Sequence, residues 1–482
     1  MKNKFRYIEQ KKRKKIFLLC DDIRMNSGIG TMAKEIVLGT AHHFNWIQLG
    51  AAMKHPEEGK AFDLSENVNK EVGIEDAYVR IVPSTGYGNA KKVRDIMKVE
   101  KPDALFIFTD PRYWDWLFEI EREIRTQVPI FWLNIWDDYP APLYNKPFYE
   151  SVDVLMAISK QTKTINELVL EEKAEDKIIN FIPHGINTKH FFPIKEGHEN
   201  YDKLLEFKKK VLKDKEYEFV LFFNSRNIAR KHPADTILAY RQFCDMIGKE
   251  KAEKCAFILH TEPIDKNGTD LKAVREAFCD SNYNNVFFST GKLETAQMNL
   301  LYNICDATIL MSSNEGWGLA LTESLMTGTP IIATVTGGMQ DQMRFVDKKG
   351  KWFTPSADVP SNHRGTYKEH GEWAVPVFPS NLSIQGSPTT PYIFDDRASI
   401  DDTADAIFKM YSYGDEERIK RGEKGRKWVN SEEAGMTAEK MCQNVIETLD
   451  EAFERFTPRN SFNMHKITDI PARYIKHKLT GY

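Results

Sequence analysis

The chain has 482 residues, of which 41% are hydrophobic and 28% are charged, and its formal net charge is -3. This length exceeds what one ordinary hydrophobic core supports, so two or three domains are expected. The nearly balanced charge excludes a general attraction to nucleic acid or membranes, and no apolar run approaches the ~20 residues that a membrane helix needs.

The cysteines are scattered and show no spacing typical of a metal site or a redox pair. They are Cys20, Cys244, Cys255, Cys279, Cys305 and Cys442. Reduced, buried thiols of this kind are typical of a cytoplasmic protein. A basic stretch at residues 11–15 precedes the apolar run Ile16–Cys20, but that run is too short for a secretory signal.

The first half of the chain alternates apolar, β-branched runs with helical stretches, as in a doubly wound parallel sheet. The predicted strands are Ile16–Cys20, Trp46–Leu49, Val79–Val82, Ala104–Phe108, Ile130–Ile135, Val154–Ile158 and Ile178–Ile182. The main predicted helices between them are Thr31–Ala41, Tyr113–Arg125 and Lys160–Leu170.

A polar, lysine-rich segment over residues 195–215 interrupts this alternation and is predicted to lie between domains. The alternation then resumes, which predicts a second α/β domain with a sheet of the same kind. Its predicted strands are Phe219–Phe223, Ala256–His260, Val286–Phe288, Ala307–Met311 and Ile331–Thr334.

Residues 348–397 are rich in Pro, Gly, Ser and Asn with little periodicity, which predicts a long insertion able to cover a cleft. Amphipathic helices are expected over residues 399–412, 416–429 and 433–456, followed by a basic tail. The predicted organisation is therefore a first domain over 1–194, a linker region over 195–215, a second domain over 216–440 and a final helix with tail over 441–482.

One segment of the second domain combines a strand, a glycine-framed loop and a short helix. The loop Ser312–Gly318 follows the strand Ala307–Met311, and the helix over Leu319–Thr327 ends at Gly328. A helix amino terminus at the carboxyl end of a parallel strand offers unpaired N–H groups to an anion. Carboxylates there accept hydrogen bonds from sugar hydroxyls.

The two carboxylates of this segment are Glu315 in the loop and Glu323 on the helix. The alternative interpretation makes Glu315 a helix cap and Glu323 a solvated helical position. For an isolated pair of glutamates, that plainer interpretation would be favoured.

The segment resembles the signature of the family 4 (group 1) glycosyltransferases, in which two glutamates are separated by seven residues. The matching residues are Ser312, Glu315, Gly316, Gly318, Glu323, Gly328, Thr329, Pro330, Gly337 and Gly338. The resemblance implies a GT-B fold, two Rossmann-like domains facing each other across a cleft, and retention of anomeric configuration. It also implies that Glu315 contacts the donor sugar and Glu323 the ribose, with Gly316, Trp317 and Gly318 at the donor.

Two further motifs resemble the same family. Arg226 and Lys231, five residues apart after the strand Phe219–Phe223, match the cations that hold the donor diphosphate, whereas the adjacent Arg230 is not required by the pattern. A nucleoside diphosphate gains charge as it leaves, so cations are needed there. Gly28 and Gly30, after the first strand, match the glycine loop that approaches the donor.

The first-domain motifs depart from the family pattern. Relatives have a His-Asp pair after the strand that corresponds to Ile130–Ile135, but Trp136 replaces the histidine and only Asp137 matches. Asp110, after the preceding strand, is a second candidate, and either aspartate could orient an acceptor hydroxyl or cap a helix. His184, in a segment that resembles the family's hinge motif, is expected to be structural.

No metal site and no cofactor are predicted, because paired aspartates are the only candidate ligands and GT-B enzymes neutralise the leaving group with side chains and helix dipoles. The co-substrate implied by the resemblance is a nucleotide diphosphate sugar. The sequence leaves the oligomeric state open.

The acceptor is less clear than the donor. Short segments around Asp21, Asp110 and Trp136 resemble glycosyltransferases of large tailed phages, which raises hydroxymethylated pyrimidines in DNA as acceptors and the host cytoplasm as location. The basic amino-terminal leader could contact phosphates or an anionic lipid surface, or keep that end soluble. Trp114, Trp116 and Trp136 could stack on a base or a sugar, although packing in the core is the commoner fate of such residues.

A glycan or a lipid-linked acceptor also stays open, and so does a reaction of another class. A nucleotide-sugar epimerase is built on the same fold, since a fold alone does not determine the reaction.

Overall fold

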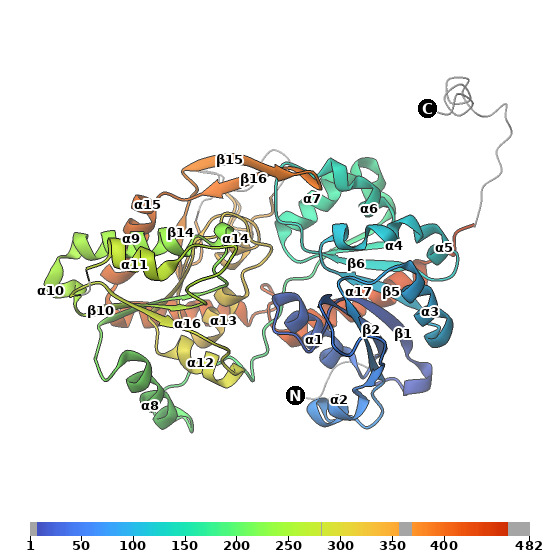
Figure 1. Cartoon of the computed structure of the whole chain (residues 1–482), viewed down its shortest axis with the longest axis horizontal. Coiled ribbons are helices and arrows are strands. Elements are labelled where there is room, and N and C mark those ends of the chain that lie inside the picture. The colour runs from blue at the N-terminus through green and yellow to red at the C-terminus, as the bar shows by residue number, and fades with distance from the viewer. Residues whose placement is uncertain (1–6, 281, 356–368, 461–482) are drawn as a thin grey trace, which may run out of the picture.

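The computed structural model describes residues 7–280, 282–355 and 369–460, and these form two α/β domains that lie side by side (Figure 1). The first sheet has the strand order β3-β4-β2-β1-β5-β6-β7-β8. Its strands are parallel except for the short β3, which pairs antiparallel with β4. Their bounds are β1 Lys14–Asp21, β2 Phe44–Met53, β3 Phe62–Asp63, β4 Val79–Thr85, β5 Ala104–Phe108, β6 Ile130–Asn134, β7 Val154–Ala157 and β8 Ile178–Phe181.

Helices connect these strands. The α-helices are α1 Gly28–Thr40, α2 Ser65–Val72, α3 Ala90–Glu100, α4 Asp115–Glu119, α5 Glu121–Arg125, α6 Lys146–Glu150 and α7 Lys160–Leu170, and the 3-10 turns are η1 Gln10–Lys12, η2 Pro111–Trp114, η3 Leu143–Asn145 and η4 Glu171–Asp176. The single helix predicted over 113–125 is wrong: it is divided into η2, α4 and α5, because the backbone leaves helical geometry at Trp114 and Ile120.

The second sheet has the order β11-β10-β9-β12-β13-β14, and its strands are all parallel. The strands are β9 Phe219–Asn224, β10 Cys255–His260, β11 Asn285–Ser289, β12 Ala307–Leu310, β13 Ile331–Thr334 and β14 Ala374–Val377. The helices that follow β8 are α8 Tyr201–Leu212, η5 Ala229–Lys231, α9 Pro233–Ile247, α10 Lys249–Ala252, α11 Leu271–Phe278, α12 Thr295–Asn303, α13 Leu319–Thr327, α14 Met339–Gln342, α15 Ile400–Ser412, α16 Gly414–Val429 and α17 Ala438–Arg455.

The prediction of an α/β fold with two doubly wound sheets is confirmed. Strands such as β5 and β13 are buried along their whole length, and for this reason they appear in the sequence as continuous apolar runs. The segment predicted as an interdomain region contains α8, which packs against α12 of the second domain.

The segment 348–397 is more regular than its composition indicates. Its residues 356–368 lie outside the described part of the chain, but the rest contains β14, the edge strand of the second sheet, and an antiparallel hairpin. The hairpin strands are β15 Asn381–Ser387 and β16 Thr390–Arg397. Most side chains of β15 are exposed, so no apolar alternation marked this strand in the sequence.

The hairpin bridges the two domains at the top of the interdomain region in Figure 1. The amide of Phe394 donates to the carbonyl of Tyr139 in the first domain at 2.7 Å, and the Tyr144 hydroxyl donates to the carbonyl of Tyr392 at 2.9 Å. On the other side, the Asn314 side-chain amide donates to the carbonyl of Phe394 at 2.9 Å. One strand therefore contacts both the loop after β6 and the loop before α13.

The chain crosses between the domains at two adjacent places. The amide of Ile186 donates to the carbonyl of Met436 at 2.9 Å, and the amide of Ala438 donates back to the carbonyl of Ile186 at 3.1 Å. After this crossing, α17 packs against α1 and β8 of the first domain. The contact is close at Gly39, where a Cβ would lie 2.4 Å from the sulfur of Cys442.

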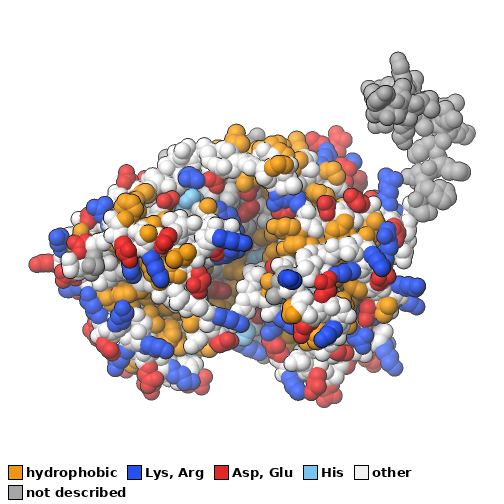
Figure 2. Space-filling view, in the orientation of Figure 1, with side chains coloured by type: hydrophobic (Ala, Val, Ile, Leu, Met, Phe, Trp, Pro, Cys, Tyr) orange, Lys and Arg blue, Asp and Glu red, His pale blue; other side chains and the backbone are white. Residues whose placement is uncertain are grey.

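The surface between the two domains is hollowed (Figure 2), so their facing loops line an open cleft. No helix of the described residues is long and apolar enough to cross a membrane. Within the same residues, no group of three or more His, Cys, Asp or Glu side chains is arranged to hold a metal ion.

Candidate active site

The loop between β12 and α13 is folded so that Glu315 faces a cluster of cations. Its carboxylate contacts the ammonium of Lys231 directly, lies 3.4 Å from Nη1 of Arg230, and accepts from Ser312 Oγ at 3.4 Å. The Glu315 side chain is only 13% exposed. A buried carboxylate needs such partners because its desolvation is costly.

Glycines let this loop pack against the next one. Gly318 has a φ of 84° at the start of α13, which is the left-handed region that favours glycine. Gly337 has a φ of 50°, and a Cβ there would lie 2.0 Å from the carbonyl oxygen of Glu315. The Gly337-Gly338 pair therefore holds the backbone of Glu315, and the amide of Gly338 donates to that carbonyl at 3.0 Å.

Lys231 is the most buried cation of the site, with 9% of its side chain exposed. Burial lowers its pKa well below the ordinary value, the adjacent Arg230 lowers it further, and Asp137 of the first domain opposes both. The η5 turn that carries Lys231 is fixed to the Glu315 loop, since the amide of Ser313 donates to the carbonyl of Arg230 at 2.8 Å. An incoming anion would replace the hydration that this cation has lost.

Arg226 lies apart from this cluster. Its guanidinium binds both carboxylate oxygens of Asp265, at 2.7 and 3.2 Å, and 62% of its side chain is exposed. The structure thus brings Arg230, and not Arg226, to Glu315, while the predicted contact of Arg226 with the donor diphosphate stays a prediction. The spacing in the sequence did not indicate Arg230, because its direction depends on the η5 turn that contains it.

Glu323 projects from α13 beside Tyr302, whose hydroxyl donates to its carboxylate at 2.6 Å. The same hydroxyl accepts from the side-chain amide of Asn224 at 2.9 Å. Burial raises the pKa of Glu323 to about 7, and the bond from Tyr302 opposes that rise. Tyr302, which no motif indicated, therefore orients the carboxylate that was predicted to hold the ribose.

Trp317 packs inside the second domain. Its side chain is 2% exposed, and its indole N–H donates to Thr322 Oγ1 at 2.9 Å. Gly316 meets the other domain, because a Cβ there would lie 3.1 Å from the carbonyl oxygen of Ile135. The Trp317 side chain thus supports the loop, and Gly316 lets that loop approach β6.

The predicted glycine loop of the first domain also faces α13. A Cβ at Gly28 would lie 3.5 Å from the side chain of Leu319, and Gly30 is packed so that a Cβ would lie 2.9 Å from the carbonyl of Met25. Ser27 caps α1 by accepting from the amide of Gly30 at 2.9 Å. The first turn of α1 therefore opens toward the start of α13.

Asp137 and Asp138 approach the same cluster from the first domain. Burial raises the pKa of Asp137, while Arg230 and Lys231 oppose that rise across the cleft. Burial and the neighbouring Asp137 raise the pKa of Asp138 well above its ordinary range. The structure thus places two carboxyls with raised pKa values opposite the cations of the second domain. Asp138 was not among the predicted catalytic residues, and the adjacent aspartates in the sequence were the signal that could have indicated it.

Asp110 caps the η2 turn that directly follows it. Its carboxylate accepts from the amide of Arg112 at 3.0 Å and from Nε of Arg112 at 2.8 Å, and it contacts a terminal guanidinium nitrogen as well. This is the capping arrangement that the sequence left open as the alternative. The guanidinium of Arg112 lies 5.3 Å from the centre of the Trp136 ring.

The aromatic and histidine candidates of the first domain are largely buried. Trp114 is fully buried and Trp136 is 6% exposed. His184 lies between Phe108 and Trp317, and burial lowers its pKa to about 3, so the imidazole is neutral at physiological pH. These residues support the cleft walls as packing groups.

The basic leader offers few cations that could bind an external anion. Arg13 pairs with Asp76 at 2.6 Å, and Lys15 pairs with Glu100 at 2.9 Å. Lys12 and Lys14 also have carboxylate partners. Lys2, Lys4 and Arg6, the other cations of the basic leader, lie outside the described residues, and so does most of the basic tail.

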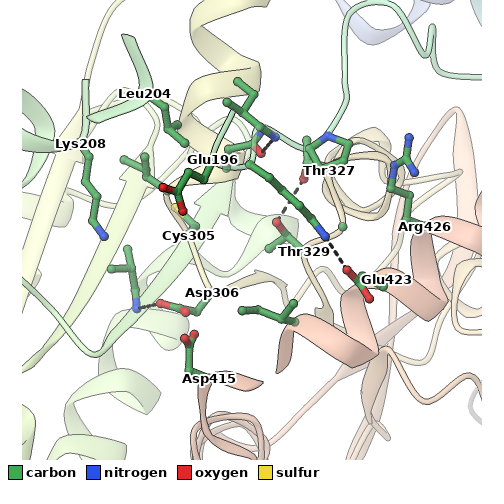
Figure 3. Close-up of a pocket in the computed structure, with 18 of the residues that line it drawn as sticks. Glu196, Leu204, Lys208, Cys305, Asp306, Thr327, Thr329, Asp415, Glu423 and Arg426 are labelled. Carbon is green, nitrogen blue, oxygen red and sulfur yellow. Dashed lines mark hydrogen bonds and ion pairs between the residues drawn. The ribbon is translucent and has the colours of Figure 1, made fainter. Parts of the chain in front are cut away.

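A large cavity of about 1110 Å³ lies elsewhere, between α8 and α16 (Figure 3). It is lined by the residues before β9 and β12, at the edge of the sheet opposite the carboxyl ends. Lys195 and Glu423 form an ion pair of 2.5 Å across it. Acidic and basic side chains alternate around its wall, and none of the candidate site residues lines it.

The comparisons with known proteins agree with this arrangement. The family described as "Glycosyl transferases group 1" matches residues 205–359, the part that contains the Glu315 loop. The chain is similar to the structure of HepE from Anabaena in complex with UDP and glucose, with 12% identity, a TM-score of 0.62, and 91% of this chain and 100% of that chain covered. No curated protein sequence matches the chain.

Two other solved structures are similar over the same extent. A glycosyltransferase from Rickettsia africae has 15% identity and a TM-score of 0.61, with 92% of this chain and 100% of that chain covered. Sucrose-phosphate synthase from Thermosynechococcus elongatus has 13% identity and a TM-score of 0.62, with the same coverage. At such identities the likeness establishes the fold, and the predicted GT-B architecture is confirmed.

Proposed function

We propose that this chain, a glycosyltransferase of GT-B fold, takes its sugar from a nucleotide diphosphate donor and transfers it with retention of anomeric configuration. The observation that carries the proposal is the cluster of Glu315, Lys231 and Arg230 facing Asp137 across the cleft. Carboxylates for sugar hydroxyls and cations for a diphosphate occur there within a few ångströms of each other.

The donor would lie along the loop before α13. Lys231 and Arg230 would bind the diphosphate, with Arg226 free to join them by leaving Asp265 on the exposed side. Glu315 would be released from Lys231 when the phosphates arrive, and its carboxylate would then accept from hydroxyls of the sugar. Glu323, oriented by Tyr302, would hold the ribose.

The chemical step breaks the bond between the anomeric carbon and the phosphate oxygen, and forms a bond from the acceptor oxygen to that carbon on the same face. The proton of the acceptor hydroxyl passes to the departing phosphate, whose charge the cations stabilise. Asp137 and Asp138 would orient the acceptor hydroxyl. Retention rests on the resemblance of the two-glutamate motif, and no metal is required in this scheme.

The experiment begins with a panel of nucleotide sugars in a thermal-shift assay, with UDP-glucose as first probe. Nucleotide release is then measured with glycan acceptors, a lipid-linked acceptor and duplex DNA containing hydroxymethylated bases, and NMR assigns the anomer of the product. A stabilising donor and a product of retained configuration are expected. Conversion of the donor to an epimer without any acceptor would overturn transfer in favour of the epimerase.

A further inference from the structure

A pair of tyrosines forms an unusual feature of the first-domain wall. Tyr87 stands between Gly86 and Gly88, whose φ angles of 63° and 77° lie in the left-handed region. A Cβ at Gly88 would lie 2.7 Å from the side chain of Leu49 at the end of β2. These glycines turn the loop after β4 over the end of β2, so that Tyr87 reaches the end of β1, where burial and then the Asp21 carboxylate raise the pKa of Tyr87.

Tyr113 lies on top of Tyr87. The two rings are parallel within 4°, with their centres 4.3 Å apart, and the edge of Trp114 supports Tyr87 from the side at 5.3 Å. Tyr113 is 50% exposed, although it belongs to the short η2 turn that Asp110 caps. The Tyr113 ring is thus held in one orientation with about half of its surface exposed. Binding of a ligand therefore does not have to supply the entropy cost of ordering this side chain.

The pair lies next to the proposed acceptor loop. Arg112, the neighbour of Tyr113, covers the ring of Trp136 at 5.3 Å, and Asp137 follows Trp136 directly. The Tyr144 hydroxyl joins this wall to the hairpin by its hydrogen bond to the carbonyl of Tyr392, and burial raises the pKa of Tyr144 while Arg112 opposes that rise. A ring stacked on Tyr113 would therefore lie beside the carboxyls that orient an acceptor hydroxyl.

The charges around the tyrosines are compensated. Arg112 is held by Asp110, and Arg24, which precedes the glycine loop, is held by Asp22 at 2.7 Å and by Glu57 at 3.3 Å. A polyanion such as DNA needs cations that are available to its phosphates. A sugar ring needs an apolar face to stack upon and carboxylates that accept from hydroxyls, and this wall has both.

We propose that Tyr113, backed by Tyr87, is the platform on which a neutral sugar ring of the acceptor stacks, so that the acceptor is a saccharide. The inference rests on the proposed function for its donor side, and it adds the chemical class of the acceptor and the residue that selects it. Tyr87 acts as a positioning residue, because it touches the platform and not the sugar.

The test separates donor from acceptor. Full-length wild type, Tyr113→Ala, Tyr113→Phe and Tyr87→Ala are compared, with Phe278→Ala as a control that removes another exposed ring, 53% exposed on the second domain. UDP binding is measured by calorimetry. Binding of methyl glucosides, methyl galactosides and lactose is measured by saturation-transfer NMR with UDP present, and nucleotide release is measured with the same saccharides and with hydroxymethylated duplex DNA.

We expect Tyr113→Ala to raise the KM for the saccharide about threefold to tenfold while UDP affinity stays the same, as for loss of one aromatic stacking contact. Tyr113→Phe should restore wild-type binding, Tyr87→Ala should give a smaller rise in KM, and Phe278→Ala should change nothing. Transfer to DNA but to no saccharide, or no saccharide binding at all, would overturn the platform. If the wild type did not bind UDP, the proposed function itself would be overturned.

Discussion

The two walls of the cleft are built in different ways. The wall that we propose to bind the donor, called the donor wall, comes from short, contiguous pieces of the second domain, in which β12, its loop and α13 present Glu315 and Glu323, and one further turn adds Lys231. The wall that we propose to bind the acceptor, called the acceptor wall, is assembled from loops after β1, β4, β5 and β6, together with the hairpin inserted in the second domain. The donor wall is therefore a local property of the sequence, whereas the acceptor wall exists only in the folded protein.

This difference between the walls indicates which of them can change its ligand specificity more easily. A strand, a turn and a helix that hold one ligand must keep their spacing, so the donor wall tolerates little variation. Loops that converge from separate strands can each change alone, and the binding residues of many enzymes lie on such loops for this reason. We therefore expect the largest effects of substitution on the donor wall and graded effects on the acceptor wall.

The largest effect is expected for Lys231→Met, which keeps the volume of the side chain and removes its charge. Because Lys231 would stabilise the departing diphosphate, kcat should fall by about 10²–10³. Steady-state nucleotide release measures the loss, and Lys272→Met, an exposed lysine of the same domain, serves as the control. If kcat of the folded variant fell by less than about threefold, Lys231 would not stabilise the departing diphosphate.

The next effect concerns the acceptor wall. Asp137→Asn should lower kcat by about 10-fold to 100-fold, since a poorly oriented hydroxyl reacts slowly, while donor affinity stays unchanged. The measurement pairs kcat with calorimetric donor binding, and the exposed Glu119→Gln on the same domain is the control. If donor affinity fell together with kcat, Asp137 would belong to the donor wall and the contrast between the walls would weaken.

A third substitution, Glu323→Gln, tests the pH dependence of the donor wall. Since the pKa of Glu323 is raised from 4.5 to about 7, wild-type affinity for intact UDP-glucose should rise as the pH passes through about 7 and the ribose partner becomes ionised. The variant should bind about tenfold more weakly at pH 8, with a flat profile. The affinity for UDP-glucose is measured by calorimetry from pH 6 to 8, and Glu276→Gln, at an exposed position of the same domain, is the control.

The same carboxyl affects stability in the opposite direction. The folded chain holds the Glu323 proton more tightly than the unfolded chain does, so its contribution to the free energy of unfolding decreases between pH 4.5 and about 7. Denaturant unfolding of Glu323→Gln should therefore depend less on pH over that range. A profile that matches the wild type in both binding and unfolding would show that Glu323 does not titrate there.

The smallest effect is expected for Tyr144→Phe, which removes the hydrogen bond from the first domain to the carbonyl of Tyr392. The loss of about 1 kcal/mol should increase hydrogen exchange of the β16 amides about fivefold and leave global unfolding nearly unchanged. Tyr201→Phe, on α8, is the control. Unchanged exchange at Phe394 would mean that the hairpin is held without this bond.

Much of the fold, and the grouping of Glu315 with its loop, could be predicted because both depend on residues that are near one another in the sequence. Strands such as β5, β12 and β13 are buried along their whole length, and the loop before α13 brings its own residues together within one turn. Which arginine reaches Glu315 could not be predicted, because the choice between Arg226 and Arg230 depends on the direction of η5.

The acceptor wall could not be predicted from the sequence, because its contacts join segments that are far apart along the chain. The stacking of Tyr87 on Tyr113 requires the order of the sheet and two positive φ angles. The β15–β16 hairpin lacks an alternating pattern, since the side chains of β15 are mostly exposed and Phe394 of β16 packs, partly buried, against the first domain. Trp136, which stands where the family pattern has a histidine, packs beneath Arg112, and this contact also joins two separate loops.

The paired crossings at Ile186 and Ala438 have a mechanical consequence. Two chain segments that are hydrogen-bonded to each other hold the domains together at one place, so we expect any relative motion of the domains to be a rotation about it. The hairpin lies at the top of the interdomain region in Figure 1, away from α17, so we expect a rotation of one domain against the other to displace it. Such a rotation would separate Phe394 from Tyr139 or from Asn314, so we expect the hairpin to limit how far the cleft opens without itself contacting the donor.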